Sequence, residues 1–99
     1  MNSPIIDKII NADPDTYIVF FEYTCSYCKN AIHLLQQKNR KFKAYNLEKI
    51  GVKNLLRLFN NHKELIGFDP NYLTKPLIFI NGKFLGGYDD LTKIISPNL

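Results

Sequence analysis

The sequence predicts an α/β fold in which a mixed four-stranded sheet is flanked by helices, in the order α-β-α-β-α-β-β-α. The apolar run at 17–21, which lacks alternation, is typical of a buried strand. Apolar residues at helical spacing follow over 26–39, which indicates a right-handed crossover to a parallel second strand. Asn81-Gly82, between two short apolar runs, predicts an antiparallel hairpin with a type I′ turn.

Each element has its own local signal. Ser3 as a cap, followed by Pro4 in the first turn, predicts a short N-terminal helix. The helix at 26–39 presents Cys28 on its apolar face, and 43–47 alternates well enough for the second strand. The remaining predicted elements are a helix over 52–66 that ends at Gly67, a loop over 68–72, strands over 77–80 and 83–85, and a last helix that contains Leu91 and ends before Pro97.

The chain of 99 residues is expected to form one domain, residues 1–99, with a core of its own. Its formal net charge is +4, and the basic cluster at 38–43 is interpreted as the solvated end of a helix rather than a nucleic-acid site. No apolar run approaches ~18 residues, and no signal-like segment is recognisable. We therefore expect a soluble, cytoplasmic protein that binds neither nucleic acid nor membranes.

The only two cysteines, Cys25 and Cys28, stand between the first predicted strand and its helix. A disulfide across so short a loop constrains the unfolded chain little, so reversible oxidation is a better use of the pair than stapling. Unpaired N–H groups and the positive end of the dipole at a helix start favour a thiolate. Cys25, at the turn, is the expected nucleophile, and the more covered Cys28 is expected to resolve mixed disulfides on Cys25.

Four short motifs, in this order along the chain, resemble the glutaredoxin family over essentially its whole length. They are Cys-Ser-Tyr-Cys at 25–28, Thr-Lys-Pro at 74–76, Phe-Ile-Asn-Gly-Lys at 79–83 and Gly-Gly-Tyr-Asp-Asp at 86–90. The resemblance implies a thioredoxin-like fold and a glutathione-dependent thiol–disulfide oxidoreductase that reduces protein disulfides and glutathione mixed disulfides. Glutathione would be the co-substrate, without a tightly bound cofactor. The partners would be glutathionylated or disulfide-containing proteins, and we expect a monomer.

The resemblance also implies which residues bind glutathione. In the family the bond before the matching proline is cis, which would turn the backbone of Lys75 toward the cysteines to pair with the cysteinyl part of glutathione. Gly86-Gly87 would bring the backbone close to the site, and the N–H groups that open the last helix suit the γ-glutamyl carboxylate. Either aspartate could instead only cap this helix. The expected glutathione-binding residues are Tyr27, Lys75, Pro76, Gly87, Tyr88, Asp89 and Asp90.

Charge at the site departs from the family pattern. Glu22 stands three positions before the first cysteine, where glutaredoxins usually carry a lysine. A carboxylate there would disfavour the thiolate and repel glutathione. Lys75, in a slot where the family often has valine, is hypothesised to supply the missing positive charge. Arg57 and Lys63 are further candidates for binding the glycyl carboxylate.

Three alternatives stay open. Ser26 replaces the usual proline, and some glutaredoxins with serine there bind a [2Fe–2S] cluster between two subunits, with the first cysteine, here Cys25, as a ligand. A zinc site of Cys25, Cys28, His33 and His62 is disfavoured because both histidines are isolated, as is typical of solvated surface residues. A redox-inactive interaction domain is disfavoured because both cysteines are present.

Overall fold

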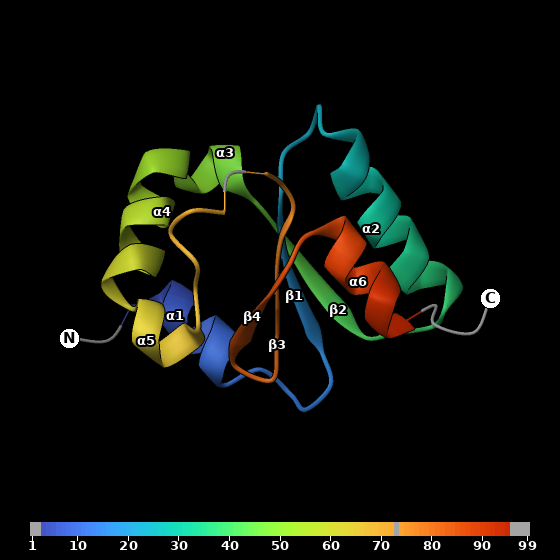
Figure 1. The fold of residues 1–99 in the computed structure, drawn as a ribbon, viewed down its shortest axis with the longest axis horizontal. Coiled ribbons are helices and arrows are strands. Elements are labelled where there is room, and N and C mark those ends of the chain that lie inside the picture. Colours follow the sequence, from blue (N-terminus) through green and yellow to red (C-terminus); the bar gives the residue numbers. More distant parts are fainter. Residues whose placement is uncertain (1–2, 73, 96–99) are drawn as a thin grey trace.

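The computed structural model describes residues 3–72 and 74–95. Its helices and strands follow nearly the predicted order (Figure 1). They are α1 (Pro4–Ile10), β1 (Tyr17–Phe21), α2 (Ser26–Gln37), β2 (Phe42–Asn46), α3 (Leu47–Ile50), α4 (Val52–Asn61), α5 (Lys63–Ile66), β3 (Leu77–Ile80), β4 (Lys83–Gly86) and α6 (Tyr88–Ile95).

The four strands form one mixed sheet in the order β2-β1-β3-β4. β1 pairs in parallel with β2, and β3 pairs antiparallel with β4, as predicted; the structure also pairs β1 with β3, antiparallel. β1 therefore lies between two strands, and because both of its faces are also covered, its sequence lacks alternation. The register pairs Phe20 with Leu77, so the chain just before β3 lies beside the chain just after β1.

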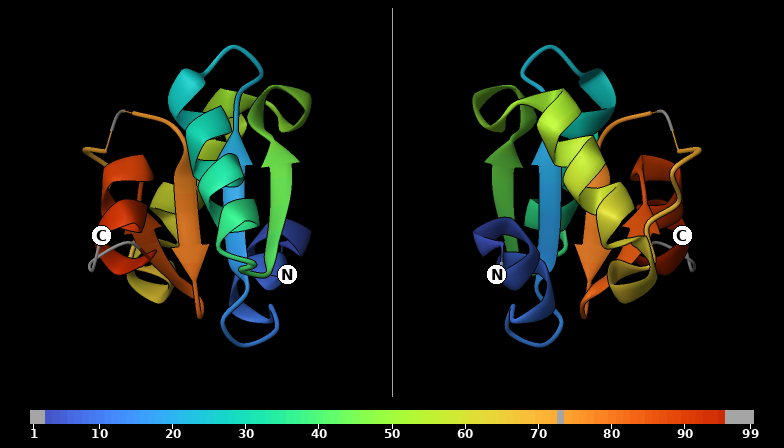
Figure 2. Two further views of the ribbon diagram at one scale, coloured as in Figure 1. Left: turned by 90° about the vertical axis from the view of Figure 1, so that its right-hand side faces the viewer. Right: turned by 90° about the vertical axis from the view of Figure 1, so that its left-hand side faces the viewer.

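Helices cover both faces of the sheet: α1, α4 and α5 lie on one face and α2 and α6 on the other (Figures 1 and 2). Alternate residues of β1 point to opposite faces, because Ile18 and Phe20 join one core cluster and Tyr17 and Val19 join the other. Three aromatic rings pack together where α4 meets the sheet. They belong to Phe20, Phe59 and Phe79, and their centroids lie 5.1 to 5.8 Å apart.

Several predicted local features are confirmed. The Ser3 hydroxyl accepts a hydrogen bond from the N–H of Ile6 at 3.4 Å, with Pro4 in the first turn of α1. Asn81 and Gly82 both have positive φ, at 50° and 81°, as a type I′ turn requires. The last helix is also confirmed, although Pro97, its predicted boundary, lies outside the described residues.

The single helix predicted over 52–66 is wrong, because the structure divides it into α4 and α5 at His62. The break lies in the polar run Asn60-Asn61-His62, whose residues have low helix propensity, and the short asparagine side chains also compete for backbone groups. Nδ1 of His62 lies 2.9 Å from the carbonyl oxygen of Leu58, an acceptor of the same helix. The predicted end at Gly67 is confirmed, since Gly67 adopts the left-handed conformation.

The second strand ends one residue earlier than predicted, and the short helix α3 follows it without a gap. Asn46 causes the change of direction, because its side-chain oxygen accepts the N–H of Lys49 at 2.8 Å and so caps α3. Gly51, at φ 102°, then separates α3 from α4.

Candidate active site

The two cysteines lie where β1 passes into α2. Cys25 is the N-cap of this helix, and its Sγ accepts the backbone N–H of Cys28 at 3.1 Å. A negative sulfur is stabilised there by the helix N–H groups and dipole. Cys25 is half-buried, while Cys28 lies on the inner side of α2 and is 1% exposed. An incoming disulfide can therefore reach Cys25 and not Cys28.

The environment of Cys28 keeps its sulfur protonated. Burial, followed by its hydrogen bond with Cys25, raises the pKa of the Cys28 thiol to about 12, although a hydrogen bond with the backbone of Glu22 acts in the opposite direction. At neutral pH this residue is a neutral thiol. It becomes a nucleophile only when a base takes its proton during the exchange.

The peptide bond between Lys75 and Pro76 is cis, as predicted, and it lies directly before β3. The antiparallel pairing of β1 and β3 places this bond beside the turn that carries Cys25. The Cys25 thiol donates a hydrogen bond to the carbonyl oxygen of Lys75, with Sγ and oxygen 3.7 Å apart. The backbone of Lys75 therefore faces the cysteine from a segment fifty residues further along the chain.

Gly86 and Gly87, the two residues before α6, are in close contact with other side chains. A Cβ on Gly86 would collide with the Asp90 carboxylate, and a Cβ on Gly87 would collide with the Tyr72 hydroxyl. The N–H of Gly87 donates to Oδ2 of Asp90 at 3.1 Å, so Asp90 closes the start of α6. Asp89 is exposed instead. The structure thus separates the two aspartates, of which Asp90 caps the helix and Asp89 faces outward.

A hollow of about 220 Å³ lies beside the cysteines and is lined by six residues from three segments of the chain. Tyr27, which is 59% exposed, and Tyr88 form one side of it, with ring centroids 6.1 Å apart. The six are Tyr27, Tyr72, Thr74, Lys75, Tyr88 and Asp89. Four of the seven predicted ligand residues thus line one hollow. Pro76 and Gly87 are buried next to its lining, and Asp90 supports the start of α6.

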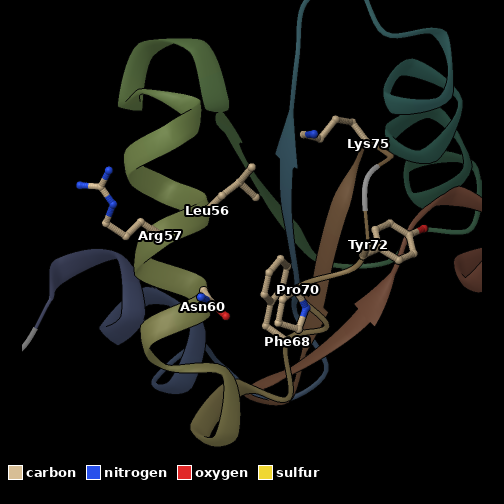
Figure 3. A pocket seen from close by; sticks show the side chains of 7 residues that line it. All are labelled: Leu56, Arg57, Asn60, Phe68, Pro70, Tyr72 and Lys75. Carbon is tan, nitrogen blue, oxygen red and sulfur yellow. The ribbon is translucent and has the colours of Figure 1, made fainter.

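A second hollow, of about 370 Å³, adjoins the first and shares Tyr72 and Lys75 with it. Figure 3 shows its walls, which also include Leu56, Phe68 and Pro70. The side chain of Lys75 extends toward α4, whereas the Arg57 guanidinium points away from the hollow.

The predicted candidate Lys63 lines neither of these hollows. It lies in another one, at the junction of α4 and α5. Of the two candidate residues on the predicted third helix, only Arg57 therefore lines the second, larger hollow, and its guanidinium does not point into it.

Two residues of the site were not foreseen. Tyr72, which lies in the loop before β3, forms part of both hollows. Glu48 accepts the backbone N–H of Tyr23 at 2.9 Å and so holds the turn that leads to Cys25. No local pattern marks either residue, because each acts on a segment that is distant in sequence.

Within residues 3–72 and 74–95, no three His, Cys, Asp or Glu side chains come together in a way that could hold a metal ion. The four residues of the zinc alternative therefore do not assemble. His33 is exposed on α2, and the ring of His62 faces the backbone of its own helix.

Comparison with known proteins agrees with this geometry. The family model described as Glutaredoxin matches residues 17–85, which include both cysteines, the cis proline and the hairpin. The chain belongs to the glutaredoxin family. It is 45% identical over 95 residues to a probable glutaredoxin of Acanthamoeba polyphaga mimivirus, covering 94% of this chain and 90% of that protein. It is 32% identical to Glutaredoxin-2 of Schizosaccharomyces pombe, covering 92% and 76% respectively.

Solved glutaredoxin structures share the fold. The solution structure of a dithiolic glutaredoxin from Trypanosoma brucei brucei superposes with a TM-score of 0.66 at 29% identity, covering 95% of this chain and 87% of that one. The predicted thioredoxin-like fold, with a mixed four-stranded sheet flanked by helices, is thereby confirmed. Membership of the glutaredoxin family makes the protein a thiol–disulfide oxidoreductase.

In the part of the chain that the structure describes, no helix has both the length and the apolar character needed to span a membrane. The related glutaredoxins include viral and mitochondrial proteins. The cytoplasmic location therefore stays a prediction.

Proposed function

We propose that this glutaredoxin reduces mixed disulfides between protein thiols and glutathione, with glutathione as the electron donor. The Cys25 thiolate attacks the glutathione sulfur, the mixed disulfide bond breaks, and the protein leaves as a thiolate that takes a proton from water. A second glutathione thiolate then attacks the new disulfide on Cys25. Oxidised glutathione, which joins the substrate's glutathionyl group to the second glutathione, is released and the Cys25 thiolate is restored, so one free glutathione is consumed for each protein thiol released.

The observation that carries this proposal is the position of Lys75. Its carbonyl oxygen is 3.7 Å from Sγ of Cys25, and the same residue lines the hollow between Tyr27 and Asp89. A peptide thiol joined to Cys25 can pair with the Lys75 backbone as a short added strand. The buckwheat glutaredoxin–glutathione complex, which has the same fold, is consistent with glutathione in such a site.

The hollow offers different chemistry for the two ends of the tripeptide. At one end, α6 begins with Tyr88 and Asp89, whose N–H groups have no acceptor within the helix and suit the γ-glutamyl carboxylate. The exposed Asp89 carboxylate suits the ammonium group of the same residue. At the other end, Lys75 extends toward α4 (Figure 3), where its charge suits the glycyl carboxylate.

Cys28 adds a second route for the reduction of protein disulfides. After Cys25 has formed a mixed disulfide with a protein, the Cys28 sulfur attacks Cys25, releases the protein thiolate and leaves an intramolecular disulfide. Glutathione then reduces that disulfide. The proposed partners are glutathione and proteins that are glutathionylated or carry a disulfide, and the protein acts as a monomer. The iron–sulfur alternative draws on Ser26 and stays a hypothesis.

The test is reduction of a glutathionylated peptide with glutathione as the sole reductant, compared with thioredoxin reductase as the electron donor. We expect turnover with glutathione and little or none with the reductase. The Cys25→Ser variant controls for the uncatalysed exchange. Turnover with the reductase and none with glutathione would mean that the protein is not a glutathione-dependent enzyme.

A further inference from the structure

Tyr72 stands between the two hollows beside the cysteines. It belongs to the loop before β3, and its ring packs edge-on against Phe84 of β4, with centroids 5.2 Å apart. Its hydroxyl points away from the larger hollow in Figure 3 and donates a hydrogen bond to Oδ2 of Asp90 at 3.5 Å. The same hydroxyl also covers Gly87 closely.

Oδ2 of Asp90 accepts two donors from different parts of the chain: the Tyr72 hydroxyl and the N–H of Gly87. The second bond alone would cap α6. The first ties this cap to the loop that ends in Lys75 and the cis proline. Both donors together fix the carboxylate over Gly86, because one hydrogen bond leaves a carboxylate free to rotate whereas two restrict it.

The position of Asp90 decides what the start of α6 presents to a ligand. While its carboxylate remains over Gly86, the residues of α6 that line the hollow are Tyr88 and Asp89, so Asp89 is the acidic side chain at this end of it. If the Asp90 carboxylate turned into the hollow, its negative charge would meet the γ-glutamyl carboxylate of glutathione.

We propose that Tyr72 is a positioning residue for the γ-glutamyl end of glutathione, acting through Asp90. This inference rests on the proposed function, since it assumes that the hollow between Tyr27 and Asp89 takes glutathione. Tyr72 does not take part in the exchange at sulfur. Its hydroxyl keeps the Asp90 carboxylate on the helix cap and thereby adds selectivity for thiols that carry a γ-glutamyl group.

The test compares two substrates that differ only in this group. Pre-reduced protein, without free glutathione, is mixed with one peptide carrying a mixed disulfide either to glutathione or to 2-mercaptoethanol, and release of the peptide thiol is followed at several substrate concentrations. Tyr72→Phe removes the hydroxyl and keeps the ring against Phe84. We expect the half-saturating concentration of the glutathione substrate to rise about threefold to tenfold, the effect of one hydrogen bond, with little change in the limiting rate.

For the 2-mercaptoethanol substrate we expect rates within about twofold of wild type, because that thiol has no γ-glutamyl group to be positioned. Tyr45→Phe is the matched control, since it removes a hydroxyl from β2, outside the lining of both hollows, and should leave both substrates unchanged. The rate of Cys25 alkylation by iodoacetamide should also be unchanged in Tyr72→Phe.

An equal loss for both substrates would show that the hydroxyl only supports the fold, and no loss for either would show that it has no role; both results overturn the proposal. These results differ from failure of the proposed function. In that case wild type itself would show no preference for the glutathione substrate over the 2-mercaptoethanol substrate.

Discussion

The N–H of Cys28 donates a hydrogen bond to Sγ of Cys25 at 3.1 Å, so the backbone of the buried cysteine contacts the sulfur of the half-buried one while its own thiol stays protonated. The two sulfurs therefore differ in their chemistry although the cysteines are only three positions apart. The N-cap position leaves Cys25 at the turn, and the first turn of α2 carries Cys28 into the inner face of the helix.

Selective alkylation tests this difference. Iodoacetamide reacts with thiolates, and burial and the hydrogen bond to Cys25 raise the pKa of the Cys28 thiol to about 12. At pH 8 the reduced, folded protein should be modified at Cys25 alone, as read by mass spectrometry of its peptides. Both residues should react in urea. Modification of Cys28 in the folded protein at a rate close to that in urea would contradict the assignment.

The raised pKa of Cys28 also predicts how stability depends on pH. Between the usual value of 9.0 and the raised value of about 12, the unfolded chain loses this proton while the folded chain keeps it. The folded state then binds more protons than the unfolded state, so the free energy of unfolding falls as pH rises through this window. Well below pH 9 both states keep the proton, and the residue does not change how stability depends on pH.

Reduced wild type should therefore lose about 1.4 kcal/mol relative to Cys28→Ser between pH 8 and pH 10. Urea unfolding of both proteins at the two pH values gives this difference directly, because other titrating groups are common to both. A constant difference between the two proteins would rule out a raised pKa.

Replacing each cysteine by serine separates the two routes of reduction. Cys25→Ser should abolish reduction of a glutathionylated peptide, since no other described thiol is accessible at the turn. Cys28→Ser should keep much of that activity, because a second glutathione can release the first from Cys25. It should lose most of its reduction of protein disulfides. Equal loss of peptide deglutathionylation in both variants would refute the assignment of Cys25 as the nucleophile.

Local signals in the sequence were sufficient for most of the fold and for the cysteine pair. Caps, periodicity and turn chemistry act within a few residues, and they placed the Ser3 cap, the Asn81-Gly82 turn and Cys25 at the start of α2. The cis bond and the proposed glutathione-binding residues are predicted from resemblance instead, because nothing local distinguishes a cis from a trans proline.

What sequence reasoning missed is non-local. Tyr72 meets Asp90 across 18 residues, and Glu48 meets Tyr23 across 25, and both contacts depend on strand register and on the path of a loop. The break at His62 was missed for a different reason: the apolar spacing continues through it, while the polar run at 60–62 interrupts the helix.

Replacing Gly86 by alanine should cost far more stability than replacing Gly67, which lies at the end of a helix. Gly86 has φ 131°, and an added Cβ would collide with the Asp90 carboxylate. Gly67, at φ 65°, has its nearest neighbour at 3.7 Å, the Lys83 side chain. Gly67→Ala should cost about 1 kcal/mol of stability, whereas Gly86→Ala should cost roughly 2 to 4 kcal/mol because strain and collision add. Urea unfolding measures both, and equal costs would mean that Asp90 moves aside without penalty.

Lys75 and Glu22, whose backbone carbonyls both accept hydrogen bonds from Cys25, carry opposite charges, and glutathione is an anion, so their removal should have different effects. Lys75 lines both hollows, and its side chain extends toward α4, where the proposed glycyl carboxylate lies (Figure 3). Lys75→Ala keeps the backbone carbonyl that faces Cys25 and removes only the charge. We expect kcat/KM for the glutathionylated peptide to fall about threefold to tenfold, while Glu22→Ala should leave it unchanged or raise it.

Salt and a matched lysine distinguish a local contact from a general charge effect. Lys43→Ala removes the same charge from an exposed position on β2 and should change kcat/KM by less than about twofold. The loss in Lys75→Ala should shrink as ionic strength rises, because screening weakens the lysine contact in wild type. Unchanged kinetics in Lys75→Ala, or an equal loss in Lys43→Ala, would contradict this prediction. Lys75 would then not replace the positive charge that the family usually carries three positions before the first cysteine.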